Sequence, residues 1–276
     1  MRHAVRFGYD GLPFAGWARQ PGRRTVEGTI REGLLRPRLR SRVDATSLEV
    51  ASRTDRGVSA RANALTLESD LTSTALVRAL NGIAPEIYFT ASAPVPSEFR
   101  VRRALRRVYR YFEPGRHNVE RWNAVARRLV GDLDVRSFGR AVPLKVPTIR
   151  SVASIQARPC PGGMVLEVAA PSFVWGQVRK MVAALRAVER EELTEDDLTA
   201  AARGEVQLTL PLAEPERLVL WEVELPVRWE STWTGPNRRQ QAHLERASAL
   251  AWSRAEMFVE LPPDGEAPRA GPKPTR

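Results

Sequence analysis

One acid in this sequence stands at a turn between two cations, an arrangement that can do chemistry. Asp55 lies in the stretch 51–60, with Arg53 two residues before it and Arg56 directly after it. Apolar segments flank the stretch, and Gly57 suits a backbone reversal, so turn chemistry alone is one interpretation. Neighbouring cations favour an ionised carboxyl group, however. Asp55 is therefore a candidate nucleophile or base acting on a polyanionic substrate.

The overall charge favours such a substrate. The 276 residues have a formal net charge of +11, and all but three of the 43 basic residues are arginine. Arginine binds phosphate in bidentate fashion and stacks on bases, which suits nucleic acid, although a GC-rich genome also favours arginine. Residues 95–128 hold ten arginines against three glutamates. This concentration is typical of a nucleic-acid contact surface, and a solvated charged face is the alternative.

A second candidate site lies inside that basic region, at residues 99–111. Arginines that can bind phosphates alternate here with Tyr109 and Tyr111, and an aromatic ring can stack on an unstacked base. The six arginines are Arg100, Arg102, Arg103, Arg106, Arg107 and Arg110. In a strand both tyrosines share one face and Arg110 takes the other. Core packing of the tyrosines is the alternative, more so for Tyr111 than for Tyr109.

A third candidate is Arg179, in a segment whose apolar residues recur at helical spacing. The pattern predicts a helix over 173–188, with Arg179 at the edge of the apolar stripe. From that edge its guanidinium can enter a cleft and pair with an acid there. The alternative is an arginine whose stem covers the edge of the apolar face while its charge stays in water.

The elements that must position these residues follow an order that occurs twice. In the first half we expect strands at 3–9, 48–51, 62–67 and 87–93, a helix after Thr25 and a helix at 73–80. In the second half we expect strands at 108–113, 151–157, 164–169 and 218–225, and helices at 120–130 and 173–188. Each half is then a ferredoxin-like β-α-β-β-α-β unit. We expect an α+β fold whose two sheets join into a central mixed, mainly antiparallel sheet, with a cleft between the halves.

The sequence divides into three regions on this basis. Residues 1–95 form the half that carries Asp55, residues 96–226 form the half with the other site residues, and residues 227–276 form an extension. Within the extension, 237–252 can form a helix. From Pro262 onward proline, glycine and charges dominate, which predicts disorder.

Several classes of protein are disfavoured. The single cysteine excludes an intrachain disulfide and a thiolate zinc cluster, and the three histidines show no metal-ligand spacing. The sequence has no apolar run of membrane-spanning length and no apolar signal core at its start. We therefore expect a cytoplasmic protein that contacts no membrane.

Short motifs along four-fifths of the chain resemble the TruA-type tRNA pseudouridine synthases, in order and at the proper spacing. The most specific is Arg53-Thr54-Asp55 followed by Gly57-Val58. The others are Tyr9-Asp10-Gly11, Phe14-Ala15-Gly16-Trp17, Gln20-Pro21, Thr25-Val26-Glu27-Gly28, Leu80-Asn81, the 99–111 block, Ser137-Phe138 and 173–182. The last fifty residues match no feature of this family.

The resemblance implies the two-lobed pseudouridine synthase fold and isomerisation of uridine in the tRNA anticodon stem-loop, at positions 38 to 40. Asp55 would be the catalytic aspartate, Tyr109 the tyrosine that stacks on the target uracil, and Arg179 the partner of the aspartate. Arg53 would help to hold the flipped nucleotide. The resemblance implies neither metal nor organic cofactor, no DNA, and a homodimer that holds one tRNA across both subunits.

Some positions depart from the family pattern without removing a proposed catalytic group. Ser52 replaces a glycine, as in archaeal members, and Ser59 replaces a frequent histidine. The other departures are 133–135, Gly176-Gln177 and Ala183. These departures leave open which uridines of the tRNA are modified.

Two other functions are compatible with parts of the pattern. A catalytically silent RNA-binding protein or chaperone would use the same cleft, but would not require the set of Asp55, Tyr109 and Arg179. A metal-dependent nuclease would require several clustered carboxylates. The nearest acid on each side of Asp55 in sequence is Glu49, on an expected strand, and Glu68, directly after one.

Overall fold

The computed structural model describes residues 1–139, 147–231, 233 and 235–259. The chain divides into two compact units, Met1–Thr234 and Gly235–Arg276. The first unit contains every candidate site residue. It is organised around a nine-stranded sheet.

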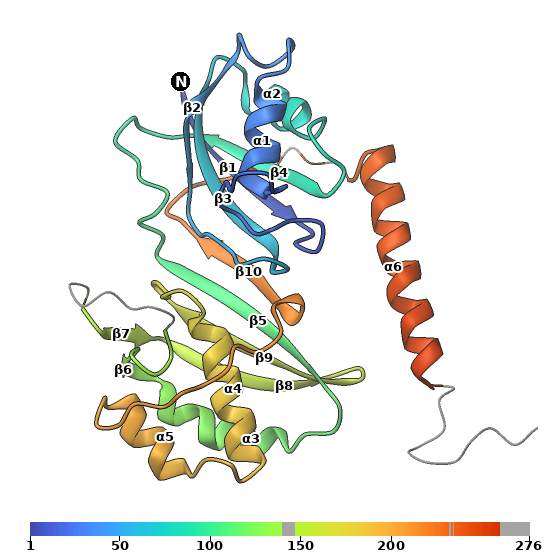
Figure 1. Ribbon diagram of the computed structural model, residues 1–276. Helices are drawn as coiled ribbons and strands as arrows, with labels where there is room; N and C mark the ends of the chain where they lie inside the picture. The colour runs from blue at the N-terminus through green and yellow to red at the C-terminus, as the bar shows by residue number, and fades with distance from the viewer. Residues whose placement is uncertain (140–146, 232, 234, 260–276) are drawn as a thin grey trace, which may run out of the picture. The chain divides into compact units, whose positions relative to one another are not determined.

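The first half of this unit has the predicted β-α-β-β-α-β order. Its elements are β1 (Arg2–Tyr9), α1 (Val26–Leu34), β2 (Val43–Val50), β3 (Ser59–Ser69), α2 (Ser73–Leu80) and β4 (Ile87–Pro94). Across the sheet the strands lie in the order β4-β1-β3-β2, and each neighbouring pair is antiparallel. Figure 1 shows α1 and α2 lying over these strands.

The second half repeats the same topology. Its corresponding elements are β5 (Arg106–Pro114), α3 (Val119–Ala126), β8 (Ser154–Cys160), β9 (Gly163–Ala170), α4 (Gln177–Glu189) and β10 (Leu218–Glu224). The strand order is β10-β5-β9-β8, again antiparallel throughout. The halves join where β10 pairs with β3 in parallel, with Val219 opposite Ser59. The predicted joining of two ferredoxin-like sheets into a mixed, mainly antiparallel sheet is confirmed (Figure 1).

Local sequence explains where the well-predicted helices begin. The Thr25 hydroxyl accepts a hydrogen bond from the Gly28 amide at the start of α1, and Thr72 caps α2 in the same way. The apolar positions Val26, Ile30 and Leu34 of α1 are buried, so the helical spacing of these residues forms one core-facing stripe.

Two predicted elements of the second half are wrong in their boundaries. Residues 151–157 are not one strand, because β7 (Ile149–Val152) pairs with β6 (Gly131–Asp134) in a separate two-stranded sheet, and β8 begins at Ser154. The helix expected from 173 begins at Gln177. Gly176 precedes it with a φ of 76°, a left-handed conformation that ends the preceding loop and cannot continue a helix.

Three further elements were not predicted, and one of them, β11, bears on where the C-terminal extension begins. They are α5 (Glu195–Ala202), the short 3-10 helix at Pro215–Arg217 and β11 (Glu230–Ser231). Another 3-10 turn, Arg127–Leu129, extends α3 over most of the expected 120–130 segment. Because β11 pairs with β4, the extension expected from residue 227 begins within the sheet unit, and the second unit starts at Gly235.

The second unit contains one long helix, α6 (Arg238–Val259). The Asn237 side chain accepts hydrogen bonds from the amides of Arg239 and Gln240, which fixes the helix start at the predicted position. The helix continues seven residues beyond the predicted end at 252. The tail expected to be disordered, from Pro262 onward, lies outside the described residues. No described helix combines the length and apolar character needed to cross a membrane.

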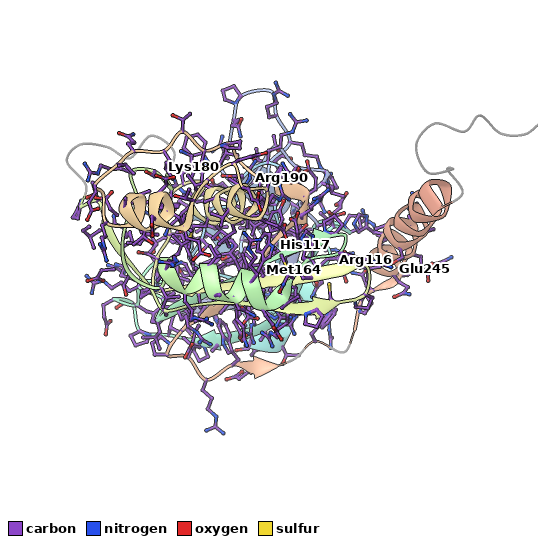
Figure 2. All side chains as sticks on the ribbon, turned by 90° about the horizontal axis from the view of Figure 1, so that it is seen from below. Arg116, His117, Met164, Lys180, Arg190 and Glu245 are labelled. Carbon is purple, nitrogen blue, oxygen red and sulfur yellow. The ribbon has the colours of Figure 1, made fainter. Side chains whose placement is uncertain are left out.

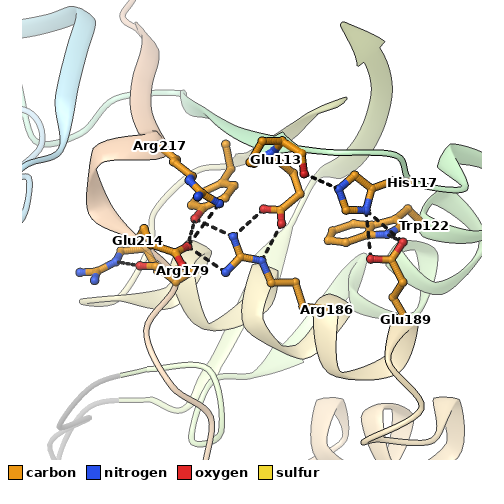
Figure 3. Close-up of polar contacts among 11 residues, drawn as sticks. Glu113, His117, Trp122, Arg179, Arg186, Glu189, Glu214 and Arg217 are labelled. Carbon is orange, nitrogen blue, oxygen red and sulfur yellow. Dashed lines mark hydrogen bonds and ion pairs between the residues drawn. The ribbon is translucent and has the colours of Figure 1, made fainter. Parts of the chain in front are cut away.

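A histidine with two acceptors ties β5 to α3 and α4. Figure 2 labels His117 near α3, and Figure 3 shows its polar contacts. Nδ1 lies 3.0 Å from a Glu189 carboxylate oxygen and Nε2 lies 2.9 Å from the Pro114 carbonyl. Trp122 donates to the same glutamate through its indole nitrogen. Only the doubly protonated ring can donate to both partners.

This geometry predicts a pH-dependent contribution to stability. Burial opposes the charged ring, but the bonds to Pro114 and Glu189 outweigh it and raise the pKa of His117. The contribution is therefore full below the ordinary imidazole pKa of about 6.5 and is lost as the pH rises through the folded value. In urea unfolding, wild type should exceed His117→Gln in free energy of unfolding by more at about pH 5.5 than at about pH 9. An equal difference at both pH values would contradict this assignment.

Candidate active site

Asp55 lies on the turn that links β2 to β3. The Val58 amide donates to the Asp55 carbonyl over 3.2 Å, and Gly57 has a φ of 81°, as the Asp-x-Gly pattern indicated. A Cβ on Gly11 would lie only 2.2 Å from the Val58 carbonyl oxygen. The glycine of the Asp10-Gly11 motif is therefore required for close packing against the turn.

The residue before Asp55 is held from two sides. The hydroxyl groups of Thr54 and Tyr9 lie 2.7 Å apart in a buried hydrogen bond, and the Trp17 amide donates to the Thr54 carbonyl over 3.0 Å. Two motifs near the N-terminus thus fix the backbone that carries Asp55.

Both carboxylate oxygens of Asp55 accept hydrogen bonds from the second half of the sheet unit. Arg179 of α4 donates from Nη1 to Oδ2 over 2.9 Å, in an ion pair. Trp175, in the loop before α4, donates from Nε1 to Oδ1 over 2.6 Å. The Asp55 side chain is 21% exposed and that of Arg179 is 11% exposed. The structure therefore brings Asp55 and Arg179 together, across more than a hundred residues of sequence.

The guanidinium of Arg179 is also held by a second hydrogen bond, from Nε. Its Nε donates to the Ala213 carbonyl over 2.6 Å, and the Ala213 amide donates back to the Arg179 carbonyl. The segment that holds Ala213 is anchored next to it, because Glu214 accepts from the Tyr111 hydroxyl over 2.7 Å and from Arg186 over 2.8 Å (Figure 3). Burial opposes the charge of Glu214, but these bonds outweigh it and lower its pKa to about 2.

Tyr109 lines the same site from β5. It is buried, with its ring edge-on to Phe173 at a centroid distance of 5.2 Å. Burial raises the pKa of Tyr109 to about 12; the nearby Asp55 charge adds to the effect and Arg107 opposes it. The phenol therefore stays neutral at physiological pH. Tyr111, on the same face of β5, is a core residue that bonds Glu214.

Arg107 lines the cleft but is held by acceptors of the protein itself. It is buried, and its guanidinium donates to the Ser52 hydroxyl, the carbonyls of Ala51 and Arg102, and, through a short contact, the Pro171 carbonyl. These bonds tie the Asp55 turn to the loop before α4. All three guanidinium nitrogens of Arg107 donate to protein acceptors, and phosphate binding by Arg107 stays a prediction.

The other predicted arginines divide by their surroundings. Arg53 and Arg102 are exposed and line the site, and Arg100 and Arg103 are exposed on the loop before β5. Arg106 is exposed but pairs with Glu224 over 3.2 Å. Arg110 lies on the opposite face of the sheet, where it pairs with Glu167 over 2.7 Å and lies over the Trp221 ring. Because it lies on the opposite face of the sheet, Arg110 is a poor candidate for contact with a substrate held at Asp55.

A cleft of about 1360 Å³ opens over Asp55, as expected between the two halves. It is lined by the Asp55 turn, the loop after β1, the loop before α4 and the segment before β10. The residues that matter for the site are Arg53, Asp55, Arg56, Tyr109, Trp175 and Arg179. Within the described ranges, no three His, Cys, Asp or Glu side chains gather as metal ligands would.

Comparisons with known proteins agree with this geometry. A family model described as tRNA pseudouridine synthase matches residues 125–226, a range that includes Arg179. Over 263 residues the chain is 32% identical to tRNA pseudouridine synthase A of Thermococcus gammatolerans, covering 94% of this chain and 97% of the relative. The chain belongs to the tRNA pseudouridine synthase family. This confirms the family predicted from the motifs.

Other curated relatives of the same name support the assignment. Identity is 34% to that of Thermococcus onnurineus, over 95% of this chain and 98% of the relative. It is 33% to that of Methanosphaerula palustris, over 91% of this chain and 92% of the relative. As a member of the tRNA pseudouridine synthases the chain is an isomerase, as expected, and the pseudouridine synthase fold accounts for its joined halves.

Two contributors to this tRNA pseudouridine synthase site are not among the residues predicted from the sequence, and a third, Arg107, is predicted but buried. Trp175 belongs to the 173–182 motif, where the only sequence signal is a tryptophan directly before a glycine. Ala213 acts through its backbone carbonyl, for which a side-chain pattern holds no signal. The burial of Arg107 was readable, because strand alternation places residues 107, 109 and 111 on one face.

Proposed function

We propose that this synthase isomerises uridine to pseudouridine in the anticodon stem-loop of tRNA, at positions 38 to 40, with Asp55 as the nucleophile on a flipped nucleotide. The observation that carries the proposal is the Asp55–Arg179 ion pair at the cleft, with Tyr109 beside it. The positions within tRNA rest on the resemblance of the motifs to the TruA type.

The reaction needs little beyond these groups. The C1′–N1 bond breaks, the uracil turns and C1′ bonds to C5. C5 then loses its proton and N1 gains one, so the product is an isomer of the substrate. The Asp55 carboxylate either attacks C1′ or removes a proton at C2′ to form a glycal, and both routes begin with a carboxylate facing the sugar. Arg179 neutralises the charge that Asp55 brings into the cleft, and its second arm on Ala213 keeps it in place.

The target base must leave its stack before the sugar can reach Asp55. Flipping costs a few kcal/mol, which contacts to phosphates can offset. The exposed arginines Arg100, Arg102 and Arg103 are the proposed phosphate contacts, and Arg53 is proposed to help to hold the flipped nucleotide. We further propose a homodimer that holds one tRNA across both subunits, which sedimentation of the protein with and without tRNA tests.

The proposal is tested by mapping pseudouridine in unmodified tRNA transcripts after incubation with the protein, and in tRNA from cells that lack it. We expect pseudouridine at one or more of positions 38, 39 and 40 in the treated transcripts, and its absence there in the deficient cells. Tight tRNA binding with no pseudouridine formed would instead indicate an RNA chaperone. Modification at other positions only would retain the chemistry and overturn the site in tRNA.

Tyr109 gives a prediction that separates stacking from its hydroxyl group. Tyr109→Phe keeps the ring that packs on Phe173, so its Kd for tRNA should stay within about threefold of wild type. Tyr109→Ala removes the stacking surface and should weaken binding by about tenfold. Fluorescence anisotropy of labelled tRNA measures both. If Tyr109→Phe binds tRNA as weakly as Tyr109→Ala, stacking is not the role of Tyr109.

A further inference from the structure

The two hydrogen-bond donors to the Asp55 carboxylate differ in exposure and in the element that holds them. Arg179 is a side chain with little exposure that is anchored a second time on Ala213. Trp175 is 53% exposed and lies in the loop between β9 and α4. Gly176, directly after it, has a left-handed φ of 76°, so the loop leaves the helix geometry at this residue. Of the two donors, Trp175 is the more exposed and the one that lies outside the helices and strands.

A nucleotide must reach Asp55 from the side where Trp175 lies. The Oδ2 side is closed by Arg179 and by the segment at Ala213. Reaction requires the attacking oxygen within about 3–3.5 Å of its target atom. The indole N–H is 2.6 Å from Oδ1, the other oxygen, and Trp175 lines the open cleft. A sugar approaching Oδ1 and the bound indole therefore compete for one oxygen.

We propose that Trp175 is a displaceable cover of the nucleophile: its indole holds Oδ1 of Asp55 in the RNA-free protein and gives way when the target nucleotide enters. This inference rests on the proposed function of the same site. The released indole lies at the rim of the cleft, where Leu12 and Arg53 are also exposed. There it stacks on a base of the bound RNA, because every base presents a face to an aromatic ring.

The proposal predicts opposite effects for two substitutions of one residue. Trp175→Phe keeps a stacking ring and removes the N–H that must be displaced, so KM for tRNA should fall about threefold, the change lying in KM rather than kcat. Trp175→Ala also removes the ring, and its KM should be about tenfold above that of Trp175→Phe. Trp233→Phe is the matched control, since Trp233 is also exposed but does not line the cleft, and should leave both constants unchanged.

A second measurement needs no turnover. The fluorescence difference between wild type and Trp175→Phe isolates the indole of Trp175, and it should change when tRNA is added. A kcat lowered tenfold or more in Trp175→Phe, with KM unchanged, would show a donor needed during the reaction and overturn the proposal. So would a difference spectrum that tRNA leaves unaltered. Wild-type protein that forms no pseudouridine but still shows the spectral change would refute the proposed function and leave the displacement supported.

Discussion

Asp55→Asn is expected to lower turnover by about 10³-fold or more, because an amide cannot act as the nucleophile or take a proton from the sugar. The amide keeps an oxygen and a similar volume at the same place. Binding of tRNA should therefore stay near the wild-type level, since it depends on the arginines and Tyr109. Release of tritium from tRNA labelled at C5 of uridine measures turnover directly.

The control for this variant is Asp132→Asn, which removes the same charge at an exposed position on β6, away from the cleft. It should turn over at the wild-type rate. Thermal unfolding of both variants establishes that they fold. Substantial turnover by folded Asp55→Asn would sink the assignment of Asp55 as the reactive group.

Arg179→Lys is expected to lower kcat by about 10²-fold, despite the retained positive charge. The guanidinium uses Nε for the Ala213 carbonyl and Nη1 for Asp55, two directions at once. An ammonium group is a single point on a flexible stem, so it cannot hold both acceptors in this geometry. The carboxylate would then lose its fixed orientation toward the sugar.

Arg190→Lys offers the matched comparison, because Arg190 is exposed at the end of the same helix. It should leave kcat, KM and the unfolding midpoint unchanged. Single-turnover kinetics with saturating protein separate a loss of chemistry from a loss of binding. If Arg179→Lys reacts at the wild-type rate, charge alone is sufficient and the second arm on Ala213 has no role.

The fold was largely predictable because its signals are local and repeated. Alternating apolar residues marked most strands of the sheet, and Thr25 marked the start of a helix at the position observed. The short β6 and β7 were missed because four residues are too few to show a period. The start of α4 was misplaced because the apolar stripe runs back to Phe173, while Gly176 breaks the helix.

The site was predictable only in part. Asp55 and Arg179 were brought to attention by motif and resemblance, and the geometry joins them. Alternation along β5 places Tyr109 and Arg110 on opposite faces, as predicted. The same alternation places Arg107 on the buried face, unlike the exposed arginines of the block. The bonds of Trp175 and Ala213 depend on how two loops meet in space, which spacing within either loop does not determine.

The parallel pairing of β3 with β10 sets the distance scale of this site. Parallel strands begin at the same edge of a sheet, so the segments that lead into them arrive side by side. One of these carries Asp55 into β3, and the other carries Ala213 into β10. The parallel pairing at Ser59 and Val219 therefore sets the separation between Asp55 and Ala213, the residue whose carbonyl holds Arg179. A slip of one residue in this pairing would part Asp55 from Arg179.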